Sequence, residues 1–106
     1  MVAMNDIQAV VDRIAEAYDP DRVVLFGSHA RGTATNDSDV DLLVILAFEG
    51  KPFWKSLEIA NRVNPPFAMD LLARRPDDTQ RRYTQGDPLI REALDQGRVL
   101  YERSHS

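Results

Sequence analysis

The chain of 106 residues is 43% hydrophobic and carries a formal net charge of −4 at pH 7. This length fits a single domain, which we expect over residues 1–106. The acidic balance argues against broad, salt-sensitive binding to nucleic acid, so no direct contact with it is expected. The chain has no cysteine, no signal-peptide pattern at its start and no apolar run near the roughly 20 residues of a membrane span. We therefore expect a cytoplasmic protein without membrane contact.

The first half of the chain predicts a helix and two strands. Apolar residues at helical spacing predict an amphipathic helix over residues 7–18, with Asn5 or Asp6 as its N-cap. Residues 23–26 form a short apolar run that predicts the first strand. Residues 39–46 predict the second strand, and its apolar part is continuous, which is typical of a strand buried on both faces.

A second helix is predicted over residues 53–62. Its spacing places Phe53, Leu57 and Ala60 on one face, which we expect to pack on the sheet. Trp54 lies beside this face and either lines a pocket for a base or, as is more common, joins the packing between helix and sheet.

The last third of the chain predicts a strand over residues 67–72, a final helix that begins at Pro88 and ends at Gly97, and a short strand over residues 98–101. The polar tract 74–87 is predicted as a solvated loop, and its arginines are alternatively a contact for a partner or substrate. These arginines are Arg74, Arg75, Arg81 and Arg82. The fold class is α/β (α+β): a small mixed β-sheet with helices packed mainly on one face.

Two carboxylates flank Val40 at the head of the second strand. If Asp39 and Asp41 belong to that strand, both side chains point to the same face, where their charges repel. A divalent cation relieves this repulsion, and Mg²⁺ is usually held by one or two carboxylates together with substrate phosphates. Taken alone, the pair is equally typical of a solvated turn.

A turn suited to phosphate follows the first strand. Gly27 lets the backbone turn sharply and approach a ligand closely. Ser28 offers a hydroxyl at the start of a short helix, whose N-terminus attracts anions, and Arg31 adds a forked set of donors. Gly32 ends this helix with a left-handed cap. The alternative is an ordinary Gly-Ser turn.

The combination of these motifs resembles a known family. Gly27-Ser28, then ten residues, then Asp39-Val40-Asp41 resembles the signature of the nucleotidyltransferase superfamily that includes polymerase beta. The longer string over residues 27–42 resembles its minimal branch, the short MNT proteins encoded beside a HEPN partner. The resemblance implies a palm-like nucleotidyltransferase fold and transfer of AMP from ATP to an acceptor hydroxyl.

The resemblance also implies a ligand set. Asp39 and Asp41 would hold two Mg²⁺ ions, and a third carboxylate would lie on a neighbouring strand. Asp70 fits this third position because it is the only charge in the apolar run 67–72, and a buried charge needs a partner or a metal. The alternative is an edge-strand aspartate that faces water. No role is assigned to His29 or His105.

The chain leaves nothing over for a second substrate domain, so we expect the acceptor to arrive on another protein. The resemblance implies a tyrosine of a helical HEPN toxin, bound in a hetero-oligomer with this protein as antitoxin. Two alternatives stay open: an antitoxin that acts by binding alone, and a small-molecule nucleotidyltransferase. The three carboxylates and Ser28 favour an enzyme, because a pure binding surface has no use for aligned metal ligands.

Overall fold

A computed structural model describes residues 2–104, so His105 lies outside the described residues. Within that range, no helix is both long and apolar enough to cross a membrane. The elements in chain order are α1 (Met4–Tyr18), β1 (Arg22–Phe26), α2 (Ser28–Arg31), β2 (Val40–Ile45), α3 (Pro52–Val63), β3 (Met69–Arg74), α4 (Pro76–Thr84), α5 (Pro88–Gln96) and β4 (Arg98–Glu102).

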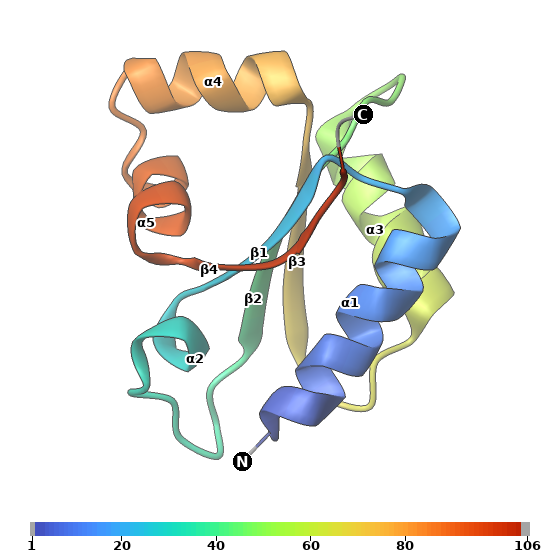
Figure 1. Cartoon of the computed structure of the whole chain (residues 1–106), viewed down its shortest axis with the longest axis vertical. Helices are drawn as coiled ribbons and strands as arrows, with labels where there is room; N and C mark the ends of the chain where they lie inside the picture. The colour runs from blue at the N-terminus through green and yellow to red at the C-terminus, as the bar shows by residue number, and fades with distance from the viewer. Residues whose placement is uncertain (1, 105–106) are drawn as a thin grey trace.

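The four strands form one mixed sheet in the order β3-β2-β1-β4 (Figure 1). β1 pairs antiparallel with both β2 and β4, and β2 pairs parallel with β3. A parallel pair needs a crossover connection, which α3 provides. The small mixed sheet expected from the sequence is confirmed.

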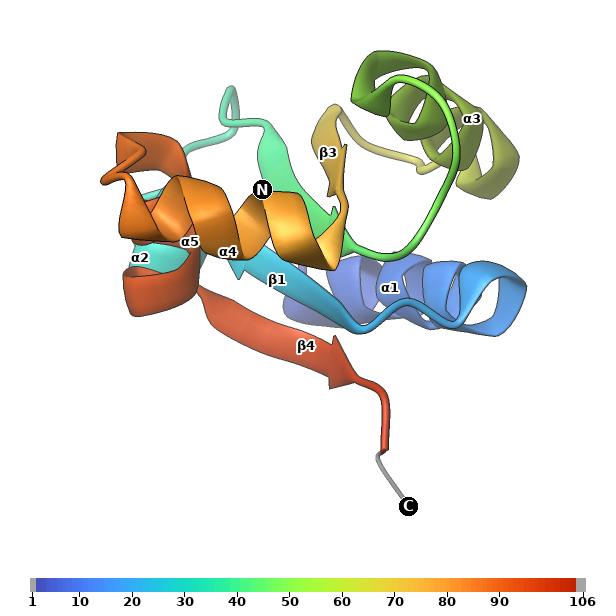
Figure 2. The same ribbon diagram turned by 90° about the horizontal axis from the view of Figure 1, so that it is seen from above.

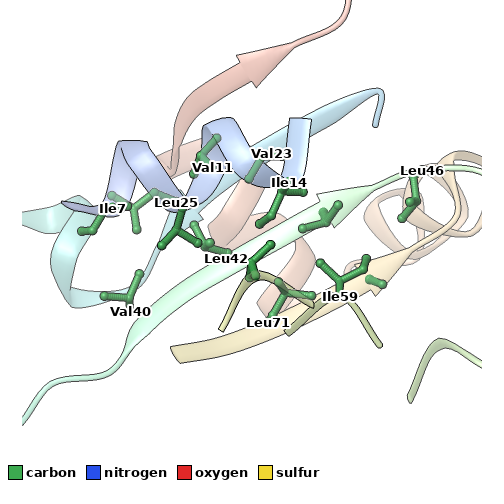
Figure 3. Close-up of a cluster of buried hydrophobic side chains, with 14 residues drawn as sticks. Ile7, Val11, Ile14, Val23, Leu25, Val40, Leu42, Leu46, Ile59 and Leu71 are labelled. Carbon is green, nitrogen blue, oxygen red and sulfur yellow. The ribbon is translucent and has the colours of Figure 1, made fainter. Parts of the chain in front are cut away.

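Both faces of the central strands are buried, which explains the continuous apolar run of β2. Leu42 and Val44 point toward α1 and α3 and join the larger core, shown in Figure 3. Leu43 and Ile45 point to the opposite face and pack with Ile90 of α5 in a smaller core. Figure 2 shows the two long helices on one side of the sheet and α4 and α5 on the other, so helices cover both faces and not mainly one.

Several element boundaries differ from the sequence prediction by one to three residues. The strand predicted over residues 39–46 spans only Val40–Ile45, so Asp39 lies outside it. α1 begins at Met4 with Ala3 as a backbone N-cap, so neither Asn5 nor Asp6 caps it. Asp6 instead lies in the first turn, where its charge favours the positive end of the helix dipole. β3 begins at Met69, two residues later than predicted, because its register is set by parallel pairing with β2.

The prediction of a loop over the polar tract 74–87 is wrong for the middle of the tract, where α4 forms. Pro76 occupies the first turn, where its missing N–H costs nothing, and acidic residues follow it. Asp78 forms ion pairs with both Arg81 and Arg82, one turn along the helix. Asp78 therefore balances the charge of two arginines of this tract as part of a helix.

The packed face predicted for α3 is also wrong. Phe53 is 66% exposed, Trp54 is 63% exposed and Leu57 is 43% exposed, so none of them is buried against the sheet. Ile59 and Val63 make the buried contacts of this helix instead. Phe53 and Trp54 stack edge to face with ring centroids 5.0 Å apart, and they leave an apolar surface open on α3.

Replacement of the N-cap of α5 provides a test of this fold. The Asp87 carboxylate accepts hydrogen bonds from the N–H groups of Leu89 and Ile90, at 3.0 and 3.2 Å. The Ile90 bond is the main reason why the pKa of Asp87 lies below its ordinary value. Asp87→Ala should therefore lower the melting temperature at neutral pH, whereas Asp87→Asn, which also caps, should lower it less.

The pH dependence of this effect has a definite sign. Because the pKa of Asp87 is depressed in the folded state, its stabilisation is present above the unfolded pKa and fades as the pH falls through the folded pKa. The melting temperatures of both proteins are measured at neutral pH and at a pH well below the ordinary Asp pKa of about 3.9. The difference in melting temperature between wild type and Asp87→Ala should become smaller in acid. A difference that does not change with pH would contradict the assignment of Asp87 as the charged N-cap of α5.

Candidate active site

Two carboxylates meet at one end of the β2–β3 pair. Asp41 of β2 lies directly opposite Asp70 of β3 in the parallel register, and opposite Phe26 at the end of β1. Side chains of directly paired residues point to the same face of a sheet, and neighbouring strands lie about 4.8 Å apart. The Asp41 and Asp70 carboxylates are therefore neighbours. Asp39 lies just before β2 and is exposed, as Asp70 is.

The electrostatics of Asp41 reflect this crowding. Burial raises the pKa of the Asp41 carboxyl, and the negative charges of Asp70 and Asp39 raise it further. Glu92 of α5 contributes in the same direction. The three aspartates predicted from the sequence thus act on one another electrostatically, although only Asp41 is partly shielded from water.

The donor set fits Mg²⁺ through its chemistry. Among residues 2–104, no three His, Asp or Glu side chains already form a closed metal cluster. Mg²⁺ does not need one, because it keeps several waters and takes one or two carboxylates together with substrate phosphates. Asp41 and Asp70, with Asp39 beside them, offer hard oxygen ligands whose mutual repulsion a divalent cation would relieve.

Gly27 is the point of closest approach to these carboxylates. Its φ of 75° and ψ of −155° lie in a region that is essentially restricted to glycine. A Cβ placed on Gly27 would lie 2.2 Å from Oδ2 of Asp41, which is less than a van der Waals contact. The loop after β1 can therefore touch the Asp41 carboxylate only because this position has no side chain.

The loop itself forms the short helix predicted from the sequence. α2 spans Ser28–Arg31, and Gly32 ends it with a left-handed φ of 77°. The N–H groups of Ala30 and Arg31 both donate to the carbonyl oxygen of Gly27, at 3.1 Å each, so the N–H groups of α2 that have no intrahelical partner are those of Ser28 and His29. His29 Nε2 lies 3.3 Å from the carbonyl oxygen of Ser38, which ties the loop to the segment that leads into β2.

Arg31 is engaged by a residue that the sequence analysis did not select. Its guanidinium NH1 lies 3.1 Å from Oε2 of Glu92 on α5. Both side chains are partly exposed, at 44% and 39%, so the ion pair itself adds little stability. Glu92 has no local sequence signal, because it is one of several polar residues on an amphipathic helix. Its place beside α2 follows only from the packing of α5 on β1.

A comparison with protein families decides the class of the chain. The sequence model of the family described as polymerase beta, nucleotidyltransferase, matches residues 8–106. The chain belongs to the polymerase beta nucleotidyltransferase family. No curated protein matches it.

Solved structures show the nucleotidyltransferase fold. A candidate nucleotidyltransferase from Sulfolobus solfataricus has a TM-score of 0.66 and 19% identity, over 93% of this chain and 79% of that one. A toxin–antitoxin structure with AMP-PNP has a TM-score of 0.59 and 20% identity, over 92% and 74%. A double mutant of the MntA–HpeT toxin–antitoxin, with two aspartates changed to glutamate, has a TM-score of 0.58 and 19% identity, over 92% and 74%.

The family membership gives the geometry a context without assigning each residue. The structure brings Gly27, Asp41 and Asp70 together, with Asp39 at the entrance to β2. Arg31 lies at the end of α2 but points to Glu92. The roles of these residues in a nucleotidyltransferase remain predictions.

Proposed function

We propose that this nucleotidyltransferase transfers AMP from ATP to a hydroxyl of a partner protein, a tyrosine of a HEPN-type toxin, and so acts as its antitoxin. The observation that carries the proposal is the Asp41–Asp70 pair across β2 and β3, beside the loop that Gly27 admits. Carboxylates packed this closely are costly unless a ligand compensates them, and the family chemistry supplies one.

Each residue of the site has a task in this reaction. Asp39, Asp41 and Asp70 would hold two Mg²⁺ ions, and such a pair neutralises charge on the attacking and leaving oxygens. Ser28 and the open N–H groups of α2 bind the phosphates, and Arg31 adds a charge-assisted bond once it leaves Glu92. Asp70, the more exposed of the paired aspartates, accepts the proton of the acceptor hydroxyl.

The proposed transfer of AMP needs no reactant other than ATP and the acceptor hydroxyl. The acceptor oxygen forms a bond to the α-phosphorus of ATP, and the bond between that phosphorus and the bridging oxygen breaks. Pyrophosphate leaves with the bridging oxygen, and the hydroxyl proton goes to Asp70. The chain therefore needs only to position the hydroxyl beside Asp70 and the triphosphate along α2.

The partner is inferred from the related structures. Two of them are toxin–antitoxin structures, and one of these contains AMP-PNP. We extend both features to this chain: a nucleotide substrate, and a toxin that forms a hetero-oligomer with it in the cytoplasm. The second candidate is an antitoxin that acts by binding alone. The Arg31–Glu92 ion pair favours that candidate, because it occupies the arginine assigned to the phosphates.

One incubation separates the two candidates. The purified protein is mixed with Mg²⁺, ATP labelled on its α-phosphate and the product of the adjacent gene, and label is sought on that product. Label on a tyrosine supports the transferase. A stable complex that stays unlabelled supports the binding antitoxin.

Asp70→Asn is expected to separate turnover from binding. An amide cannot take the proton of the acceptor, so we expect the single-turnover transfer rate to fall about a hundredfold or more, within the usual range of general base catalysis. The affinity for Mg²⁺–ATP should stay within a few-fold, because Asp39 and Asp41 remain. The paired measurement is calorimetric ATP binding and single-turnover transfer. Normal turnover would place the base elsewhere.

The ion pair predicts opposite effects for its two members. Arg31→Ala should weaken ATP binding about tenfold, since a bond to a charged group contributes about 1.5–3 kcal/mol, and Ser28→Ala should weaken it less. Glu92→Gln should tighten ATP binding a few-fold, because it frees Arg31 and removes a negative charge near Asp41. Calorimetric titration of all three variants measures this. Weaker binding in Glu92→Gln would show that Glu92 positions Arg31.

A further inference from the structure

β3 is an outer strand of the sheet, and no strand formed by residues 2–104 neighbours one side of its backbone. The carbonyl oxygens of Ala68 and Arg74 accept hydrogen bonds from N–H groups of the β2 segment. Because backbone groups alternate in direction along a paired strand, the odd-numbered residues Met69, Leu71 and Ala73 point theirs away from the sheet. Figure 2 shows β3 at one margin of the sheet with α3 beside it.

The outer edge of β3 is capped at one end only. Ser56 of α3 accepts a hydrogen bond from the Ala73 N–H at 2.9 Å. For Met69 and Leu71, no side chain within residues 2–104 makes such a bond to the backbone. Exposed edges of this kind are normally blunted by charge, proline or a covering segment, because they pair readily with another chain.

A cleft of about 440 Å³ runs along this edge, between α3 and β3. Its α3 wall includes Phe53 and Leu57, the two apolar side chains that the sequence analysis expected to be buried and that are exposed instead. Its β3 wall includes Met69 and Leu71. Apolar walls beside unpaired backbone groups are the two features that recognise an added strand.

The two ends of the cleft carry opposite charges. Asp70 lies at the end that belongs to the candidate active site, and Arg74 and Arg82 lie at the other. Arg82 pairs with Asp78 and Asp87, but no carboxylate within residues 2–104 forms an ion pair with Arg74. Burial lowers the pKa of Arg74, and the positive charge of Arg82 lowers it further. Asp78 and Asp87 oppose this lowering of the Arg74 pKa without pairing with it, and the guanidinium donates to the carbonyl oxygen of Ala73. A carboxylate from outside the chain would supply the direct ion pair that Arg74 lacks within residues 2–104.

We propose that an extended segment of the acceptor protein adds to the outer edge of β3, with its acceptor hydroxyl beside Asp70 and an acidic side chain against Arg74. This inference rests on the proposed function and adds the docking mode of its acceptor. Backbone pairing at Met69 and Leu71 supplies affinity, and the charged end sets the register of the segment.

The strand geometry fixes the spacing of the two recognised side chains. Asp70 and Arg74 are four residues apart on β3 and point to the same side, since side chains alternate along a strand. An added strand has the same rise of about 3.3 Å per residue, so its hydroxyl residue and its acidic residue are also four positions apart. The order of the two depends on whether the added strand is parallel or antiparallel.

The probe for this proposal is a capped, dye-labelled nine-residue peptide with a central tyrosine and a glutamate at each end. It places an acid four positions from the tyrosine in both directions, and alternating valine and glutamine fill the remaining positions. One comparison peptide has proline on both sides of the tyrosine, and another has glutamine in place of both glutamates. Fluorescence anisotropy without ATP measures binding, and label transfer from ATP is measured separately.

We expect the probe to bind at least about tenfold more tightly than the proline peptide, which cannot form strand hydrogen bonds. Arg74→Gln should remove the advantage of the probe over its glutamine version, while Arg62→Gln, at an exposed arginine of α3 outside the cleft, should retain it. Met69→Pro removes one outward N–H from the first residue of β3, so it should weaken binding of the probe more than Met69→Ala, which removes only the side chain that packs on the core.

The outcomes distinguish this proposal from the function on which it rests. Binding with these preferences but without label would support the cleft and contradict transfer to tyrosine. Label on all peptides at equal rates, with no effect of Arg74→Gln, would support transfer and overturn docking at β3. Equal binding of the probe and the proline peptide, or binding of neither, would also overturn it.

Discussion

Asp41→Asn is expected to abolish AMP transfer, with a fall of at least about a thousandfold, because loss of a metal ligand removes several kcal/mol of transition-state stabilisation. The same change should raise the melting temperature in the absence of Mg²⁺. Burial and the charges of Asp70 and Asp39 disfavour the ionised Asp41 carboxyl, and a neutral amide avoids that cost. The measurements are label transfer from ATP and thermal unfolding with chelator.

Asp37→Asn is the matched control for this prediction. Asp37 is an exposed aspartate in the loop before β2, outside the β2–β3 pair. The Asp37→Asn variant should transfer AMP at nearly the wild-type rate, and its melting temperature should be unchanged. Asp39→Asn should resemble Asp41→Asn in activity. Full transfer by Asp39→Asn or by Asp41→Asn would mean that the metal site is misassigned.

Gly27→Ala is expected to inactivate the protein by steric conflict. The backbone at Gly27 has a conformation that costs a non-glycine residue about 1–3 kcal/mol. Its Cβ would also lie 2.2 Å from Oδ2 of Asp41, so either the loop or the carboxylate must move. We expect a lower melting temperature and a loss of transfer about as severe as that of Asp41→Asn.

Two controls separate the effect of backbone strain at residue 27 from the effect of displacing the Asp41 carboxylate. Gly32→Ala introduces a side chain at a left-handed residue with nothing within 4 Å, so it should cost some stability and keep most of the activity. Gly27→Ala in an Asp41→Ala background should be less destabilising than in the wild type, because the carboxylate that it meets is gone. Equal costs in both backgrounds would show that the backbone alone accounts for the effect.

The centre of the fold could be predicted from the sequence because its local patterns reflect burial and backbone conformation directly. The apolar run of β2 is continuous since both of its faces are buried, against α1 and α3 on one side and α5 on the other. Gly27 and Gly32 mark the two positions with positive φ that bound α2. Asp70 stood out as a charge within an apolar run, and the parallel register places it opposite Asp41. It is nevertheless exposed on an edge strand, so the burial on which its prediction rested is not observed.

Other features depend on neighbours distant in the sequence. α4 has no regular apolar stripe, and its Asp78 pairs with Arg81 and Arg82 resemble the charge mixture of a loop. The apolar spacing of α3 predicts a buried face that includes Phe53, but Phe53 is 66% exposed and Ile59 and Val63 make the buried contacts instead. Glu92 has meaning only beside Arg31, and only the packed structure brings them together.

The intact mass of the partner tests most directly whether this nucleotidyltransferase modifies a partner protein. The adjacent gene product is purified after co-expression with the wild-type chain and, separately, with Asp41→Asn. We predict a mass increase of one or more AMP groups with the wild type, located on tyrosine by fragmentation, and none with the variant. An unmodified partner that still forms a complex with both proteins would contradict the account.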